Sequence, residues 1–136
     1  MSEVTNLELV TPERLMLSAE VKMVVVPGAD GDFGVLVRHS PMVSNIRPGV
    51  VSIYKDGLNA GVSSQMFVAG GFAEVTGERC TILAEEAVDV ADIDASAAAT
   101  RLANAEKAVA DASSEGEANQ AARELAIAEA MVKAAA

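Results

Sequence analysis

The sequence predicts an all-β sandwich of about ten strands followed by a C-terminal antiparallel α-helical hairpin. Turn formers and aromatics are concentrated in the first part of the chain: all four prolines, all four aromatic residues and nine of the ten glycines precede residue 90. The 46 residues after residue 90 contain 19 alanines and one glycine, and alanine is the strongest helix former. We therefore expect residues 1–88 to form the β-sandwich domain and residues 89–136 to form the hairpin.

Short apolar segments recur in the first part about every ten residues, with turn signals between them and no helical period. This spacing favours an antiparallel sandwich or barrel in which sequential strands pair as hairpins or short arches. Asp56 and Gly57 predict a two-residue hairpin turn, because Asp-Gly adopts positive φ at low cost. Residues 27–34, Pro-Gly-Ala-Asp-Gly-Asp-Phe-Gly, are interpreted as an exposed turn or arch. The expected strands are 7–10, 15–20, 21–26, 50–55, 65–69, 72–75 and 80–85.

The C-terminal part predicts two helices, because small and apolar residues repeat at alternating spacings of three and four. Residues 113–116, Ser-Ser-Glu-Gly, separate the repeats, so the two helices should reverse as a hairpin. Asp94 is expected to cap the first helix, with Ile93 packing toward Ala98. A buried alanine contributes about 0.8 kcal/mol against roughly 2 to 3 for leucine, so we expect the hairpin to dock weakly and detach easily. The repeats are Ala98, Leu102, Ala105, Val109 and Ala112, then Ala118, Ala121, Leu125, Ala128 and Val132.

Charge and composition exclude several classes of protein. A formal charge of −10 and a pI near 4.4 disfavour nucleic-acid binding, and no apolar run approaches the roughly 20 residues that span a bilayer. Residues 1–6 lack the basic flank and apolar stretch of a signal peptide. His39 is the only histidine and Cys80 the only cysteine, so we expect no catalytic residues and no metal site. Cys80 is expected to be buried in a strand, and Glu85 and Glu86 to face opposite ways.

Residues 27–34 contain features of two ligand-binding loops but complete neither. The Lys-Ser/Thr pair of a phosphate-binding P-loop is absent, and the later ligands of a calcium loop do not follow Asp30 and Asp32. The apolar residues around this segment are unusual for an exposed loop. They predict either local core packing or, as we favour, a docking surface beside Arg38 and His39. These apolar residues are Phe33, Val35, Leu36, Val37 and Met42.

Several short motifs resemble the epsilon subunit of bacterial F-type ATP synthases. Residues 67–75 resemble the SGG-hydrophobic-hydrophobic-EV motif of that family, and residues 81–87 fit the strand that closes its sandwich. The resemblance covers the whole chain, including the helical hairpin, and is specific only when the motifs are taken together. The motifs that follow the family's PG-x-x-G-x-x-G, GHAPL and KPG patterns are residues 24–28 (Val-Val-Val-Pro-Gly), 31–36 (Gly-Asp-Phe-Gly-Val-Leu), 39–42 (His-Ser-Pro-Met) and 47–50 (Arg-Pro-Gly-Val).

The resemblance implies a non-catalytic subunit of the central stalk, or rotor, of a proton-translocating ATP synthase. In the family this subunit binds the gamma subunit and the ring of c subunits, so the sandwich couples rotation of the c-ring to gamma. We expect gamma to contact the neighbourhood of Gly70, Gly71 and Phe72. Val37 and Arg38 replace the Pro-Gly that usually precedes the histidine, which removes a flexible hinge. The expected contacts with the c-ring are Asp32, Phe33, Arg38, His39, Ser40 and Met42.

In the family the hairpin also regulates ATP hydrolysis, either folded against the sandwich or extended into the alpha/beta catalytic head. Some members bind ATP through an I/L-D-x-x-R-A motif, which is degenerate here because Ala97 follows Ile93 and Asp94 in place of arginine. Glu129 also stands where a basic residue is expected. Residues 91–136 carry eight acidic and four basic side chains. We therefore expect no ATP binding and weak or absent inhibition.

The sequence thus predicts protein partners and no cofactor. These partners are gamma, the c-ring and, if the hairpin extends, the alpha and beta subunits; no nucleic acid and no homo-oligomer are expected. The chain should lie peripherally at the cytoplasmic face of the bacterial inner membrane, held there through the complex. One alternative is a sandwich that binds a small ligand, with the helices as an oligomerisation tail, but an aromatic content of 3% offers it little. The other is an enzyme, for which a nucleophile–base pair is missing.

Overall fold

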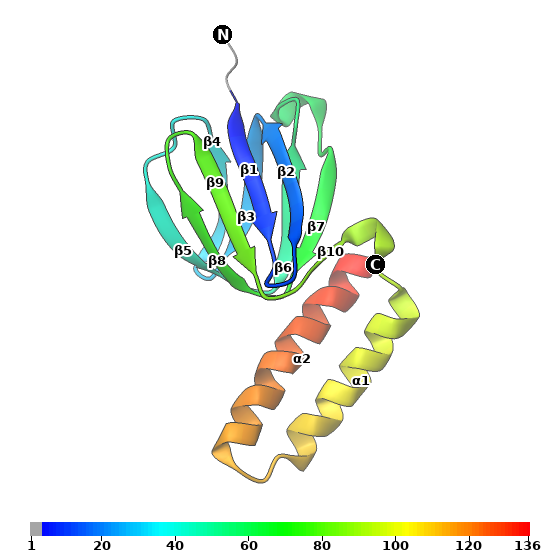
Figure 1. Cartoon of the computed structure of the whole chain (residues 1–136). Coiled ribbons are helices and arrows are strands. Elements are labelled where there is room, and N and C mark those ends of the chain that lie inside the picture. The colour runs from blue at the N-terminus through cyan, green and yellow to red at the C-terminus, as the bar shows by residue number, and fades with distance from the viewer. Residues whose placement is uncertain (1–3) are drawn as a thin grey trace.

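The computed structural model describes residues 4–136, which form a ten-stranded β-sandwich followed by two α-helices, as predicted (Figure 1). The sequence analysis found no signal-peptide features in residues 1–6. Residues 1–3 of that segment lie outside the described residues. The strands are β1 (Thr5–Val10), β2 (Leu15–Val21), β3 (Met23–Gly28), β4 (Gly31–Leu36), β5 (Met42–Ile46), β6 (Gly49–Tyr54), β7 (Ser64–Val68), β8 (Gly71–Val75), β9 (Arg79–Ala84) and β10 (Ala87–Asp89). The helices are the short 3₁₀ segments η1 (Leu58–Ala60) and η2 (Val90–Asp92), then α1 (Ala95–Asp111) and α2 (Glu115–Ala135).

The strands form two layers that face each other. One layer contains β10, β7, β6, β3 and β4, and the other contains β5, β8, β9, β1 and β2. A single backbone pair, Gly28 with Ile46, joins β3 to β5. Alternate residues of both layers point inward, so the two faces meet in one dry core that makes the sandwich a stiff body. Fully buried members of this core include Leu7, Leu9, Val21, Val24, Val26, Val35, Val51, Val68 and Ile82.

The exposed turn expected over residues 27–34 is present, but it is much shorter than predicted. Strand β3 continues to Gly28 and β4 begins at Gly31, so only the two residues between them turn the chain. Glycine is needed at position 28 because a Cβ there would lie 2.7 Å from Gly31 O and 2.9 Å from the Phe33 ring. A glycine that permits close packing of two strands was mistaken for a loop signal. Strands β5 and β10 also lie outside the predicted set.

Two further expectations about the strands are wrong. Asp56 and Gly57 do not close a two-residue hairpin, because β6 ends at Tyr54, β7 begins at Ser64, and η1 lies between them. The sandwich is not wholly antiparallel either, since β1 pairs in parallel with β9 as well as antiparallel with β2. The parallel pair joins segments from opposite ends of the domain. No local turn signal can reveal such a pairing.

Helix α1 begins directly after its predicted cap, Asp94, whereas α2 begins at Glu115, inside the segment 113–116 that was expected to separate the helices. Asp94 caps α1, and its Oδ1 accepts hydrogen bonds from two backbone N–H groups of the first turn, at 2.9 and 3.2 Å. Ser114 caps α2 through its hydroxyl, which accepts from the backbone N–H of Glu117 at 3.1 Å. The Glu117 carboxylate in turn accepts from the backbone N–H and hydroxyl of Ser113, and these bonds lower the pKa of Glu117. The tight reversal between the helices is therefore tied to the first turn of α2.

The hairpin packs on the outer side of β7. Met66 and Val68 point into the sandwich core, whereas Phe67 between them points outward. Phe67 is nevertheless 0% exposed, because Ile127 and Met131 of α2 pack against it. Figure 1 shows the hairpin leaving the sandwich beside β10, with its tip far from the strands. Only one end of the hairpin is therefore docked.

Candidate interaction surfaces

The residues expected to contact the c-ring lie along β4, in the connection from β4 to β5, and at the start of β5. Asp32 lies near the start of β4, opposite Pro27 of β3, and His39 lies beyond the end of the strand. About 13 Å of strand separates Asp32 from Leu36, at 3.3 Å per residue. Among the described strands, β4 pairs with β3 and with no other. The structure therefore sets these residues along a sheet edge and does not gather them in one pocket.

Asp32 has a partner within the chain. Arg47 donates from Nη2 to Asp32 Oδ1 and from Nη1 to Gly28 O, the latter at 2.6 Å. Both side chains are exposed, so this ion pair contributes at most about 1 kcal/mol to stability. It ties the β3–β4 turn to the connection between β5 and β6. The Arg47-Pro48-Gly49 motif therefore has a structural role.

The chain reverses between β4 and β5 at Arg38, which has a φ of 66° and is the one non-glycine residue of the described chain with positive φ. Its backbone N–H donates to Gly77 O at 2.7 Å, which ties the reversal to the connection between β8 and β9. The neighbouring His39 Nδ1 lies 2.7 Å from Ser40 O. A left-handed conformation costs a non-glycine residue roughly 1 to 2 kcal/mol. The hinge expected in the family is replaced here by a fixed and strained turn.

The apolar residues around this edge divide between core and surface. Val35 is fully buried, and Phe33 and Met42 are partly buried and pack against the core. Leu36 is 53% exposed at the end of β4. Val35 is therefore not part of the predicted docking cluster, because its side chain points into the sandwich core. Leu36 is the apolar side chain that this edge exposes.

A second surface lies on the outer face of the layer that contains β8, β9, β1 and β2. Phe72 pairs with Leu83, Leu83 with Val10, and Val10 with Leu15, so four apolar residues cross four adjacent strands. Phe72 is 42% exposed and Leu15 is 53% exposed. We call these four residues the apolar stripe. The sequence analysis found Phe72 and missed the other three, which only the strand register brings together.

Gly70 and Gly71, expected to contact gamma with Phe72, have a structural role. Their φ angles are 120° and 130°, a region that side chains disfavour. A Cβ on Gly71 would lie 2.0 Å from Leu83 O, and Gly70 is buried. The glycines therefore shape the backbone of this surface, and Phe72 supplies the side chain that a partner can reach.

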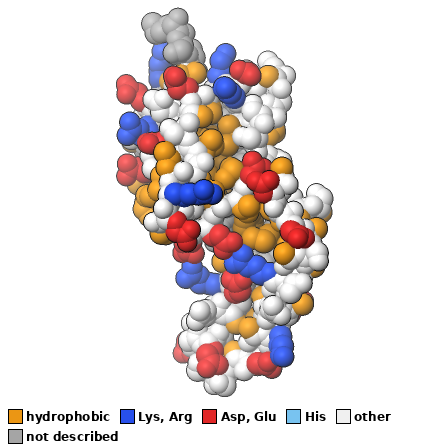
Figure 2. Space-filling model, turned by 45° about the vertical axis from the view of Figure 1, so that its right-hand side comes forward, with side chains coloured by type: hydrophobic (Ala, Val, Ile, Leu, Met, Phe, Trp, Pro, Cys, Tyr) orange, Lys and Arg blue, Asp and Glu red, His pale blue; other side chains and the backbone are white. Residues whose placement is uncertain are grey.

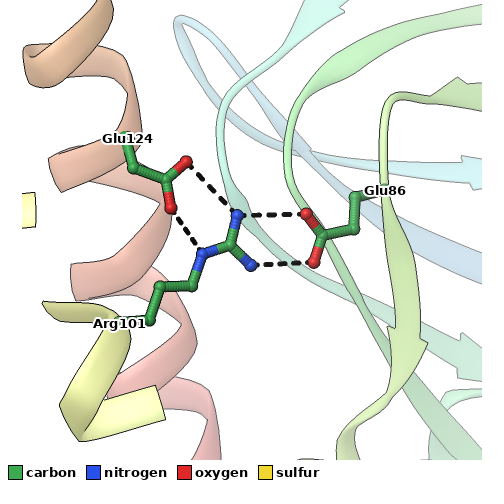
Figure 3. Close-up of polar contacts among 3 residues, drawn as sticks. All are labelled: Glu86, Arg101 and Glu124. Carbon is green, nitrogen blue, oxygen red and sulfur yellow. Dashed lines mark hydrogen bonds and ion pairs between the residues drawn. The ribbon is translucent and has the colours of Figure 1, made fainter. Parts of the chain in front are cut away.

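Charged side chains of both signs gather where the hairpin meets the sandwich (Figure 2). Glu86 accepts two hydrogen bonds from Arg101 of α1, at 2.8 and 3.1 Å. Glu85 accepts from Arg123 of α2, at 2.7 and 2.8 Å. Arg101 also donates to Glu124 of α2 (Figure 3), and its bonds to Glu124 and then Glu86 hold the Arg101 pKa above its usual range. The expectation that Glu85 and Glu86 face opposite ways, as neighbours on a strand do, is wrong, because both lie in the connection between β9 and β10 and both bind the hairpin.

A cavity of about 790 Å³ lies between the two helices and the sandwich, lined in part by these same five charged side chains. Three of the five are carboxylates, and both arginines are paired with carboxylates. A nucleotide triphosphate would therefore have to displace ion pairs to enter. Of the degenerate motif, Asp94 caps α1, Ile93 packs in the cluster around Phe67, and Ala97 brings no charge.

The remaining chemistry of the described chain is limited. Within residues 4–136, no three histidine, cysteine or acidic side chains gather closely enough to hold a metal ion. In the same residues, neither long helix has the apolar length needed to cross a membrane. Cys80 is fully buried, and burial raises the pKa of its thiol to about 11. The thiol is therefore protonated and unreactive near neutral pH.

The chain is similar over nearly its whole length to proteins of one family. Residues 4–90 match the family model described as ATP synthase, Delta/Epsilon chain, beta-sandwich domain. The ATP synthase epsilon chain of Rhodospirillum rubrum is 52% identical over 134 residues, which cover 98% of each chain. That of Paramagnetospirillum magneticum is 49% identical over 136 residues, which cover 100% of each chain.

Two solved structures have a similar fold. A chain of the Euglena gracilis mitochondrial ATP synthase, in a structure of OSCP, F1 and the c-ring, superposes with a TM-score of 0.81 at 24% identity, covering 98% of this chain and 82% of that one. A chain from the central stalk and c-ring of the Tetrahymena thermophila mitochondrial ATP synthase superposes with a TM-score of 0.72 at 15% identity, covering 97% and 96%. At these identities the likeness concerns the fold alone, and it includes the hairpin as well as the sandwich.

Proposed function

Because the chain belongs to the ATP synthase delta/epsilon family and matches epsilon chains over nearly its whole length, we propose that it is a non-catalytic subunit of the central stalk of a rotary ATP synthase. The observation that carries this proposal is a densely packed two-layer sandwich with two separate uncovered surfaces, the apolar stripe and the β4 edge. A body of this kind can be held from two sides and transmit rotation without deforming. It works as a peripheral part of the complex, on the cytoplasmic side of the membrane.

The apolar stripe is the proposed contact with the gamma subunit. Single exposed hydrophobic residues are common on protein surfaces, whereas a continuous row across four strands marks an interaction site. Phe72 is the one aromatic residue in the row, and aromatic residues are frequent anchors of protein interfaces. Val43 on β5, which is 68% exposed, extends the same layer beyond Phe72. The hairpin packs on the other layer and leaves this face open.

Capture of gamma by the tagged, full-length chain tests this contact. The variant Phe72→Ser is expected to weaken binding of gamma at least about tenfold, as loss of an aromatic anchor does. The matched control is Leu58→Ser, because Leu58 is 64% exposed but lies on η1, in the connection between β6 and β7. If Phe72→Ser binds gamma as well as the native chain does, or if both variants lose the same affinity, gamma does not bind this face.

The β4 edge is the proposed contact with the c-ring. Asp32 and Leu36 are exposed along β4, and Arg38, His39 and Ser40 follow at its end. An edge strand also presents backbone groups that no neighbouring strand pairs. The contact is therefore elongated, and it combines the charge of Asp32 at one end with the polar reversal at the other.

ATP-driven proton pumping in membranes that carry the assembled synthase tests this second contact. Asp32→Asn combined with His39→Ala is expected to lower pumping while the isolated subunit still folds. Because Asp32 pairs with Arg47, the control is Arg47→Gln, which breaks the same ion pair and keeps the Asp32 charge. If Arg47→Gln lowers pumping as much as Asp32→Asn alone, Asp32 acts only through its internal pair. Full pumping by the double variant would refute the contact.

The hairpin is proposed to be at most a weak inhibitor of ATP hydrolysis by the alpha/beta head. Its surplus of acidic side chains disfavours an acidic partner surface. Deleting residues 91–136 is expected to raise the ATPase activity of the purified synthase by less than about twofold. Because the deletion uncovers Phe67, the truncated chain should also carry Phe67→Ser. A much larger rise would show that the hairpin inhibits strongly.

A further inference from the structure

The docked end of the hairpin is held by apolar packing on one side and by ion pairs on the other. The apolar part centres on Phe67, with Ala98, Ile127 and Met131 among the residues packed around it. Beside it the cavity of about 790 Å³ leaves the helices and the sandwich apart. The ion pairs of Arg101 and Arg123 span this gap.

The two acidic residues that make these pairs are neighbours in the sequence. Glu85 and Glu86 lie in the short connection between β9 and β10, which is part of the sandwich. Glu86 binds α1 and Glu85 binds α2. One short segment therefore holds both helices, so neither helix can leave the sandwich without breaking one of its pairs.

We propose that Glu85 and Glu86 form a charge clasp that determines how often the hairpin leaves the sandwich. Arg101 is the central residue of the clasp, because its guanidinium binds Glu86 on the sandwich and Glu124 on α2 at the same time (Figure 3). When the clasp opens, the Arg101 pair with Glu124 stays within the hairpin. The two helices therefore leave together as one unit.

The exposure of the two pairs determines how the clasp responds to its surroundings. The Arg101 side chain is 28% exposed, whereas that of Arg123 is 68% exposed. Exposed ion pairs are weakened by dissolved salt, and the half-buried bidentate pair less so. Docking is therefore sensitive to ionic strength, and it is also sensitive to any basic segment that competes for the two glutamates.

The reactivity of two thiols in the full-length chain measures this equilibrium. A cysteine introduced by Ala98→Cys, at a 1% exposed position of α1 that packs in the cluster around Phe67, is alkylated only when the hairpin lifts. The native Cys80 lies in the sandwich core at 0% exposure and is alkylated only when the sandwich opens. The ratio of the two rates therefore separates release of the hairpin from general unfolding. Ala69→Cys, on the sandwich side of the same contact and 4% exposed, is a second reporter if Ala98→Cys disturbs packing.

Neutralising the clasp with Glu85→Gln and Glu86→Gln is expected to raise alkylation of the introduced thiol about tenfold, with no change at Cys80. Raising the salt concentration to about 1 M should speed the same reaction in the native background and leave the neutralised variant unchanged. The control Glu8→Gln removes a carboxylate that pairs with Arg79 on the sandwich, away from the hairpin, and should change neither rate.

Glu124→Gln separates the clasp from general weakening of the helices. It breaks the Arg101 pair inside the hairpin and keeps the pair with Glu86 on the sandwich. Its effect on the introduced thiol should therefore be smaller than that of Glu86→Gln alone. A change below twofold in the neutralised variant, a parallel rise at Cys80, or equal effects of Glu124→Gln and Glu86→Gln would overturn the clasp.

Discussion

Phe67 and Phe72 lie on the outer faces of the two opposed layers, and their surroundings are opposite. Phe67 is 0% exposed because the hairpin packs over it, whereas Phe72 is 42% exposed in an open apolar stripe. Both side chains point away from the sandwich core. One outer face is therefore completed by the chain itself, and the other is left open, where we propose that a partner binds. The comparison shows that two similar apolar positions on opposite layers can differ completely in exposure, because the hairpin covers only one of them.

Substitutions on the two faces should be detected by different measurements. Removing an apolar group from the covered face lowers the stability of the isolated chain, because a cavity forms there. Removing one from the open face leaves the isolated chain nearly unchanged, because that group was already in water. The open face should matter only in the assembled complex.

The largest effect is expected from Phe67→Ala. Truncating a buried phenylalanine costs about 3 kcal/mol or more, so the free energy of unfolding in urea should fall by about that amount. Phe72→Ser is the matched change on the open face and should alter the free energy of unfolding by less than about 0.5 kcal/mol. Equal losses from the two variants would show that the faces do not differ in the way their exposure indicates.

A smaller effect is expected at high pH from Cys80, the buried thiol whose strand also carries Leu83 of the open face. Burial raises the Cys80 pKa from 9.0 to about 11, so the unfolded chain loses this proton before the folded chain does. The contribution of the protonated thiol to the free energy of unfolding is therefore fully present below pH 9. It falls as the pH rises from 9 towards 11, and the loss is about 1.4 kcal/mol at pH 10.

Unfolding in urea at pH 8 and pH 10 measures this loss. The control is Cys80→Ala, which titrates like the native chain at every other group. If both proteins lose the same stability between the two pH values, the thiol is not responsible.

The smallest effect is expected from Arg38→Gly, at the reversal that is tied to the open layer through Gly77. Glycine tolerates the φ of 66° observed at this position, so the substitution should stabilise the isolated chain by about 1 kcal/mol without altering either face. Arg38→Ala removes the side chain but keeps the backbone strain, so it should not raise the stability of the isolated chain. Equal thermal stability of the two variants would show that the backbone of Arg38 is not strained.

The sequence by itself determined the order of the parts and the start of α1. These features depend on residues close together in the chain: alanine repeats, the Asp94 cap, and turn formers between short apolar runs. It could not predict β4, because the glycines of residues 27–34 indicate a loop as readily as they permit close strand packing. The motifs likewise pointed to the family, but not to the whole set of residues on each surface.

Only the tertiary structure decided what those surfaces are. The apolar stripe exists because four adjacent strands place Val10, Leu15, Phe72 and Leu83 in register. The clasp exists because folding brings Glu85 and Glu86 beside arginines of both helices. Local patterns follow from backbone geometry over a few residues, whereas these contacts depend on strand register and docking between segments far apart in the chain.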